Sequence, residues 1–297
     1  MNRFLGGNIL LSLGAAVMWG GGDFSGGMGV KRSGGSLGAG LRIVLLSHAT
    51  SFVVLLTLAH LRGDAMPHGT LLAWGIAAGV AGGGALTAFY IALSRGAMGA
   101  SAAVSGLLAA AIPALLTLYQ QGPPGISPLL GFAVAAIAIW LIAASPAEEK
   151  TGGGTRQTMA LAMLAGVGFG FYFVALKLAS PTGVIWPMAS ARIGSLSICS
   201  LMFITHRIRS GKKDAQLGRL NRSAVVWALA TALLDTSGNL LFVAATRAGR
   251  LDVASVLASL YPATTILLAA LALGEWPSRR QALGMAAAAV AVALIAL

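Results

Sequence analysis

Long apolar runs dominate the chain and recur at intervals of roughly 20 to 30 residues, from Ile9 to the last residue, Leu297. A transmembrane helix needs about 20 apolar residues, because the hydrocarbon core of a bilayer is about 30 Å thick. The pattern therefore predicts an all-α membrane protein with ten transmembrane helices. The predicted spans are 8–30, 36–59, 70–94, 99–119, 126–145, 157–179, 184–206, 223–245, 250–273 and 279–297.

The chain divides into two similar halves around a polar segment. Residues 146–156 read PAEEKTGGGTR, which is typical of a flexible, solvated linker. Landmarks of the first half recur in order in the second at offsets of 149 to 153 residues: Trp19-Gly20 with Phe169-Gly170, Arg42 with Arg192, Tyr90 with Phe242, Pro113 with Pro262, and Gly131 with Gly284. We therefore predict a five-helix repeat at 1–146, a linker at 147–156 and a second five-helix repeat at 157–297.

The number of spans in each repeat fixes the orientation of the two repeats relative to each other in the membrane. Because five is odd, the second repeat must enter the membrane from the opposite side, which makes the two units inverted repeats. Such repeats are typical of transporters, in which two similar halves rock around a central site. Both termini lie on one side of the membrane. Which side stays open, because the positive-inside rule places the termini outside largely on the strength of one basic segment, 207–222.

Composition and charge exclude several other classes of protein. Only 9% of the residues are charged, against about 25% in a soluble domain. The net charge of +12 sits mainly in short segments between apolar runs, so we expect no nucleic-acid partner. Cys199 is the only cysteine, and the four histidines form no HExxH or similar motif. We therefore expect no metal, no cofactor and no enzymatic activity. A membrane-bound transferase and a passive channel are the remaining alternatives.

Several landmarks together resemble the EamA-type drug/metabolite transporter superfamily: Trp19-Gly20, Arg42, the paired Pro113 and Pro262, and Gly274-Glu275 followed by Gln281 and Gly284. Within it, the chain resembles the YddG-type exporters of aromatic and other neutral amino acids. The resemblance implies a multi-pass carrier of the bacterial inner membrane, with a central cavity that both halves line. Phe169 replaces the tryptophan of the first repeat, so the two halves need not contribute equivalent residues.

Charged side chains inside spans are the first candidates for a binding site, because a charge at mid-bilayer costs on the order of 2.5 to 3.5 kcal/mol. Asp235 lies in mid-span with Asn239 on the same helix face. Asp23 lies one turn after Trp19, an arrangement suited to a substrate ammonium. Lys177 is a further candidate, which favours a zwitterionic substrate. Arg42 and Arg192 are interpreted as anchors that extend to the membrane interface.

Aromatic residues are scarce, so their placement is informative. Five of them lie within spans at or near repeat-related positions and are candidates for binding flat apolar side chains: Trp19, Tyr90, Phe169, Phe173 and Phe242. Pro113 and Pro262 occupy equivalent mid-span positions, where each frees a backbone carbonyl. We predict that these two prolines act as hinges.

The sequence thus predicts a secondary carrier that exports neutral, especially aromatic, amino acids and related metabolites by alternating access. An exporter of cationic or lipophilic drugs such as methyl viologen is the alternative. No GxxxxGK[ST] sequence is present, so ATP hydrolysis on this chain is not expected. We expect a monomer in the lipid bilayer, with a dimer left open.

Overall fold

The computed structural model describes residues 2–94, 98–143, 155–210, 221–274 and 276–296, and within these ranges it contains helices and no strand. The helices are α1 (Asn2–Arg32), α2 (Leu37–Arg62), α3 (Thr70–Ser94), α4 (Met98–Gln121), α5 (Ile126–Ala143), α6 (Thr155–Ala179), α7 (Ile185–Ser210), α8 (Arg222–Ala248), α9 (Leu251–Ala258), α10 (Tyr261–Leu273) and α11 (Arg279–Ala296). Seven helical stretches in these ranges are long and apolar enough to cross a membrane, one of them formed by α9 and α10 together. The prediction of an all-α membrane protein is confirmed. The predicted linker, apart from residues 155 and 156, lies outside the described residues.

The ninth predicted span is found as the candidate membrane span Leu251–Ala272, but it is not the one continuous helix that the sequence predicts. It breaks after Ala258, and α10 begins at Tyr261. Pro262 has no amide hydrogen for the carbonyl of Ala258, and its ring suits the first turn of a new helix. Pro113, its counterpart, lies inside the uninterrupted α4.

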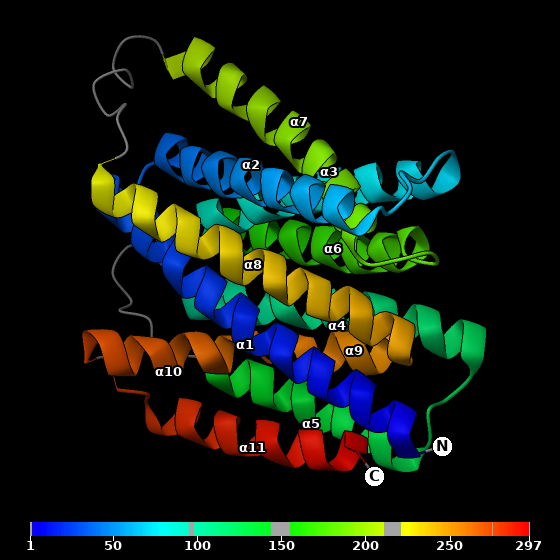
Figure 1. Ribbon diagram of the computed structural model, residues 1–297. Coiled ribbons are helices and arrows are strands. Elements are labelled where there is room, and N and C mark those ends of the chain that lie inside the picture. The colour runs from blue at the N-terminus through cyan, green and yellow to red at the C-terminus, as the bar shows by residue number, and fades with distance from the viewer. Residues whose placement is uncertain (1, 95–97, 144–154, 211–220, 275, 297) are drawn as a thin grey trace.

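The packing of the helices has the twofold pattern expected of inverted repeats. The first helix of each predicted repeat packs against the third helix of the other predicted repeat: α1 on α8, and α6 on α3. Likewise α4 packs on α6, and α9 and α10 pack on α1, while α2 pairs with α7 and α5 with α11. Figure 1 shows α2, α3 and α7 on one side of the bundle and α5 with α11 on the other. The start of α1 and the end of α11 lie at the same end of the bundle, which we call the terminus end.

Glycines allow the central helices to approach very closely. A Cβ atom added to Gly79 of α3 would lie 1.7 Å from the carbonyl oxygen of Ala191 in α7. One added to Gly194 of α7 would lie 2.1 Å from the carbonyl oxygen of Ile76. No side chain fits in either place, so the two backbones are in direct contact. Small residues at helix crossings serve this purpose in membranes, where lipid gives no hydrophobic drive for helix association.

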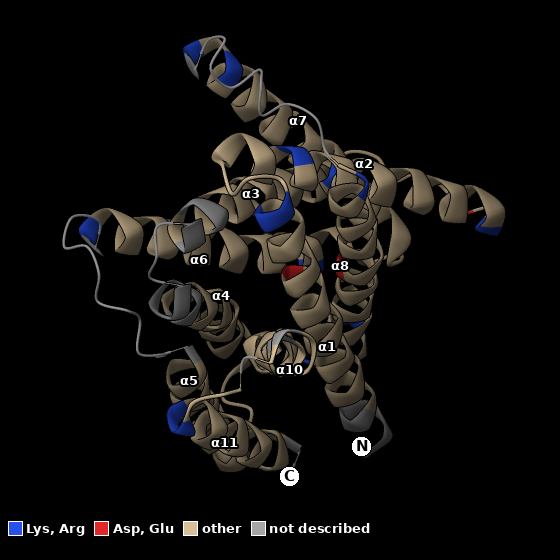
Figure 2. Cartoon of the chain, turned by 90° about the vertical axis from the view of Figure 1, so that its left-hand side faces the viewer, with Lys and Arg blue, Asp and Glu red and all other residues tan. Residues whose placement is uncertain are grey.

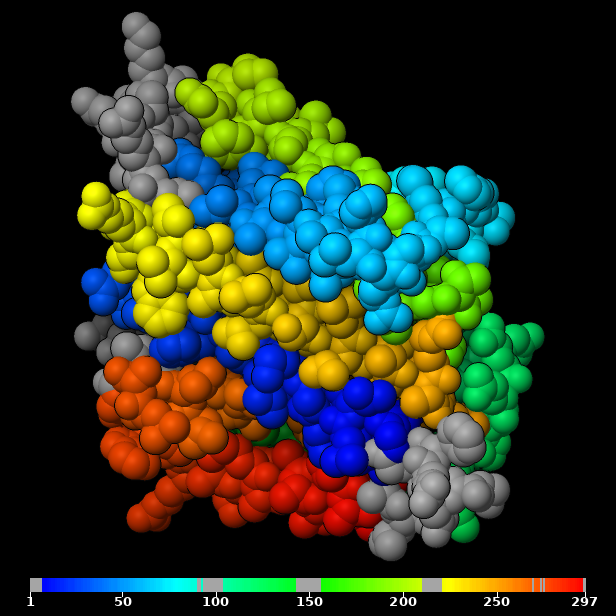
Figure 3. All heavy atoms as spheres, in the orientation of Figure 1, coloured from blue at the N-terminus to red at the C-terminus, as the bar shows by residue number. Residues whose placement is uncertain are grey.

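The outer surface is apolar, as a lipid-facing surface requires. Large side chains such as Leu10, Leu115 and Val226 are exposed on different helices. Figure 3 shows α2, α8 and α1 packed side by side on one such face. In the view of Figure 2, Lys and Arg are scattered over several helices rather than gathered on one. This distribution agrees with charges that orient a membrane protein rather than bind a polyanion.

Candidate substrate cavity

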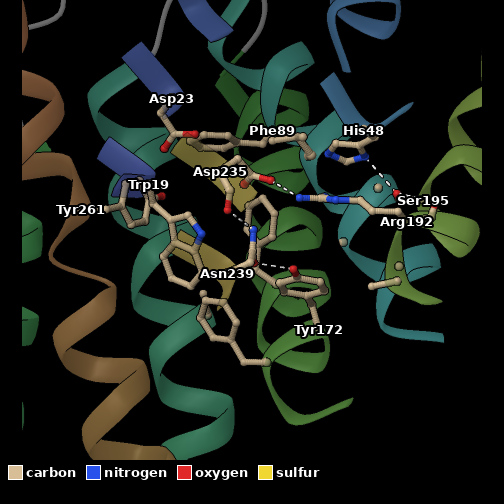
Figure 4. A pocket seen from close by; sticks show the side chains of 18 residues that line it. Trp19, Asp23, His48, Phe89, Tyr172, Arg192, Ser195, Asp235, Asn239 and Tyr261 are labelled. Atoms are coloured by element: carbon tan, nitrogen blue, oxygen red, sulfur yellow. Dashed lines mark hydrogen bonds and ion pairs between the residues drawn. The ribbon is translucent and has the colours of Figure 1, made fainter. Parts of the chain in front are cut away.

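A cavity of about 90 Å³ lies between the two halves of the bundle, where α1, α2, α3 and α4 meet α6, α7, α8 and α10. Its volume suits roughly six to nine water molecules, since each needs about 10 to 15 Å³. Figure 4 shows that the side chains that line it come from helices on several sides. Six of the predicted site residues line it: Trp19, Asp23, Phe169, Phe173, Asp235 and Asn239.

Three aromatic rings, which we call the aromatic floor, form one side of the site. The rings of Trp19 and Phe173 are stacked, with centroids 5.3 Å apart and planes at 5°. Phe242 lies behind them, fully buried, with its centroid 4.5 Å from that of Phe173. It supports the two rings without lining the cavity itself. Such an array offers a flat apolar face to a ligand ring.

An ion pair crosses the cavity between α7 and α8. A guanidinium nitrogen of Arg192 donates to a carboxylate oxygen of Asp235, and the Nε of Arg192 donates to Ser51 Oγ at 2.9 Å. Thr236 Oγ1 donates to the same Ser51 oxygen at 2.6 Å. The side chain of Arg192 is 5% exposed and that of Asp235 is 30% exposed. The carboxylate therefore faces the cavity, with the guanidinium largely behind it.

This geometry corrects the interpretation of Arg192 as an interface anchor. Its side chain turns inward because it bonds there to the carboxylate of Asp235 and the hydroxyl of Ser51. A side chain that extended to the membrane surface would lose both hydrogen bonds. Arg42, its repeat counterpart, is half-buried, and its guanidinium lies 5.6 Å from the ring centroid of Phe203. The two arginines therefore occupy equivalent positions in the sequence but different environments.

A polar wall adjoins the ion pair. The hydroxyl of Tyr172 donates to Asn239 Oδ1 at 2.5 Å, and Asn239 Nδ2 donates to the backbone oxygen of Asp235 at 2.7 Å. His48 Nδ1 lies 2.9 Å from Ser195 Oγ. Sequence reasoning missed Tyr172, His48 and Ser195. The signal for His48 was available, since an ionisable histidine inside a span is as unusual as a charged residue.

Asp23 is the second carboxylate of the cavity. It lies near Asp235 and Tyr261, as Figure 4 shows. Among the described residues it has neither a hydrogen bond nor an ion pair. The described lining residues thus include two carboxylates and one guanidinium, and the guanidinium already has a carboxylate partner.

The remaining candidates lie elsewhere. Lys177 does not line the cavity, because its Nζ donates to the carbonyl oxygen of Thr246 at the end of α8. Tyr90 belongs to α3, but its side chain is outside the described part of the chain. Pro113 and Pro262 flank the region on α4 and α10 without lining the cavity.

Basic side chains hold helices together between the aromatic floor and the terminus end. Each donates to a backbone carbonyl at or just beyond the end of a neighbouring helix. The pairs are Lys177 with Thr246, Arg247 with Ser180, and Arg250 with Gly122. These carbonyls have no partner within their own helix, and positive charge there complements the helix dipole. The contacts close α4, α6 and α8 around the loop before α9.

Comparison with known proteins identifies the second half of the chain. No curated protein sequence matches significantly. One solved structure, titled only "Crystal structure of protein", matches with a TM-score of 0.73 at 15% identity, over 97% of this chain and 95% of that chain. This likeness shows a shared fold. Residues 156–297 match the EamA-like transporter family. The match covers slightly less than half of the chain, and it supports a multi-pass membrane transporter of small molecules rather than an enzyme.

Proposed function

We propose that the protein is a secondary carrier of the bacterial inner membrane that exports neutral, especially aromatic, amino acids, as YddG-type exporters do. The observation that carries the proposal is the cavity itself, in which a flat aromatic floor adjoins charged side chains. An aromatic amino acid needs both features, since its ring is apolar and its backbone carries opposite charges.

This geometry offers a partner to each group of the ligand. A substrate ring would stack on Trp19, and its ammonium would lie between Asp23 and Asp235. The substrate carboxylate would accept hydrogen bonds from Arg192 or from the donor groups of the polar wall. The sequence favours Lys177 as the partner of the substrate carboxylate. We instead assign this role to Arg192, which lines the cavity.

Alternating access is the transport mechanism that we propose. The repeats 1–146 and 157–297, joined by 147–156, would exchange conformations so that the cavity opens to each side in turn. One chain supplies the walls of the cavity, so the proposal requires only a monomer.

One observation favours a second candidate, the export of cationic aromatic compounds such as methyl viologen. The described lining of the cavity has one carboxylate more than it has guanidinium groups, and the carboxylate of the ion pair is its more exposed member. A cation over an aromatic face gains about 0.5 to 2 kcal/mol. A ligand without a carboxylate would therefore also find complementary charge.

Exchange across proteoliposomes tests both candidates. Vesicles containing the purified protein are loaded with unlabelled phenylalanine, phenethylamine, methyl viologen or a sugar phosphate, and entry of the labelled compound is measured at equal pH on both sides. The variant Trp19→Ala removes a ring of the floor. Its matched control is Trp140→Ala, since Trp140 is exposed on α5 and lies outside the cavity.

We expect saturable phenylalanine exchange in the wild type and in the Trp140 variant. Loss of one stacked ring costs about 0.5 to 1.5 kcal/mol, so the Trp19 variant should bind roughly 2- to 10-fold more weakly. Exchange of viologen without phenylalanine would establish the second candidate instead. Absence of saturable exchange for every compound would refute both.

A further inference from the structure

The charges of the cavity leave one carboxylate without a counter-ion. Arg192 and Asp235 neutralise each other through their ion pair. Asp23 has no such partner in the described part of the chain, although it lines the same cavity. An ionised group inside a membrane is costly unless it is paired or solvated. Asp23 therefore needs either a proton or a cation beside it.

The neighbours of Asp23 do not supply that cation. The titratable or charged groups that share the cavity are Asp235 of α8, Tyr261 of α10, Arg192 of α7, His48 of α2 and Tyr172 of α6. Arg192 is held by Asp235 and Ser51, and His48 by Ser195. Tyr172 donates its hydroxyl proton to Asn239. Arginine, histidine and this tyrosine thus each bond to a partner other than Asp23.

The backbone places Asp23 where helices of the two halves meet closely. A Cβ atom at Gly22 would lie 3.4 Å from the amide nitrogen of Asp235, and one at Gly20 would lie 2.6 Å from the carbonyl oxygen of Tyr261. Asp23 therefore lies at the contact of α1 with α8 and α10. A change in the charge of its side chain acts directly on the interface along which the two halves would move.

We propose that Asp23 exchanges a proton for the positively charged group of the substrate, so that the protein is a proton–solute antiporter. The inference rests on the proposed function. When the substrate ammonium binds, the proton on Asp23 leaves to water in the cavity, and the carboxylate pairs with the ammonium. When the substrate leaves on the other side, Asp23 takes up a proton, and the carrier returns with a neutral side chain. One proton moves against one substrate.

This stoichiometry predicts how transport responds to voltage. A zwitterionic amino acid has no net charge, so each cycle moves one positive charge in the direction opposite to the substrate. Its transport should therefore respond to the membrane potential. A monovalent amine such as phenethylamine carries the same charge as the proton, so its exchange should be insensitive to the potential.

Two measurements on the full-length protein test the proposal. The first records proton release when phenylalanine or phenethylamine is added to purified protein in weakly buffered detergent solution at several pH values, with tryptophan fluorescence as an independent measure of binding. The second records accumulation in proteoliposomes under a pH gradient, with the potential clamped at zero. The variants are Asp23→Asn and Asp23→Glu. The control is Asp64→Asn, which alters a carboxylate of the α2–α3 loop outside the cavity.

We expect the wild type and the Asp64 variant to release protons on binding and to accumulate substrate about tenfold for each pH unit, as one-for-one exchange requires. Asp23→Asn should lose both properties, and Asp23→Glu should restore them. Substrate binding to the wild type without proton release would overturn the proposal, as would undiminished proton release in Asp23→Asn. If saturable exchange occurs at equal pH but a pH gradient drives no accumulation, this inference alone is overturned. If no exchange occurs at all, the proposed function is overturned.

Discussion

The ion pair between Arg192 and Asp235 gives the most quantitative prediction. We consider Arg192→Met, Asp235→Asn and the double variant. Methionine keeps an apolar stem at position 192 but leaves the carboxylate without a counter-ion. Asparagine removes the charge that faces the guanidinium but leaves its hydrogen bond to Ser51. The double variant has neither charge.

The exposure of each side chain sets the expected magnitudes. Breaking a buried ion pair from one side costs about 3 to 5 kcal/mol in the free energy of unfolding. The Asp235 side chain is 30% exposed, so we expect Arg192→Met to cost about 3 kcal/mol, at the low end of that range. The Arg192 side chain is 5% exposed, so we expect Asp235→Asn to cost about 4 kcal/mol. The double variant should lose about 4 rather than 7 kcal/mol, a coupling of about 3 kcal/mol.

Unfolding by SDS in mixed micelles measures these free energies. The exposed pair of Arg62 and Asp64, with N and O 3.5 Å apart, provides the control cycle and should give a coupling below about 1 kcal/mol. If the two cycles gave equal coupling, or if the losses in the cavity pair were additive, the inward-facing ion pair would be refuted.

Three further predictions concern packing, the basic contacts and the hinge. Gly79→Ala should destabilise the protein by several kcal/mol in the same assay, because its Cβ would overlap a backbone oxygen of α7, whereas Gly84→Ala should be neutral or stabilising because nothing lies within 4 Å of the added atom. Lys177→Met should lower stability by about 0.3 to 1 kcal/mol and leave the substrate dissociation constant unchanged, since the side chain caps a helix end outside the cavity; weaker binding would show that it reaches the substrate. Pro262→Ala should restore an amide donor at the helix break and slow turnover at saturating substrate more than it alters binding; unchanged turnover would exclude a hinge there.

The helical spans could be predicted because their signal is local. Each needs only a sufficient length of apolar residues, and the length is fixed by the bilayer. The break between α9 and α10 could not be predicted in this way, because Pro113 and Pro262 lie in similar sequences. Yet α4 continues through its proline, where Thr117 donates to the carbonyl oxygen of Pro113 at 2.7 Å. Which proline ends a helix depends on neighbouring groups that the local pattern does not contain.

The candidate site could be predicted only in part, for a related reason. Asp23 and Asp235 stand out as charges in apolar runs, and Trp19 and Phe173 as rings in mid-span. Whether a basic residue turns inward or outward depends on a partner far away in the sequence, so Arg192 could not be assigned without Asp235. Lys177 shows the opposite error: the sequence placed it with the candidate site residues, but its partner, the carbonyl oxygen of Thr246, lies outside the cavity.

The helix breaks before Pro262 but continues through Pro113, and this difference also bears on the direction of transport. If the two repeats were identical, exchanging their conformations would convert one access state into its mirror counterpart at no cost in free energy. Among the described helices, the break in the second predicted repeat has no equivalent in the first. The energy difference between the inward-facing and outward-facing states must come from such unlike positions, which makes the break a natural place to alter the resting preference of the carrier without touching its cavity.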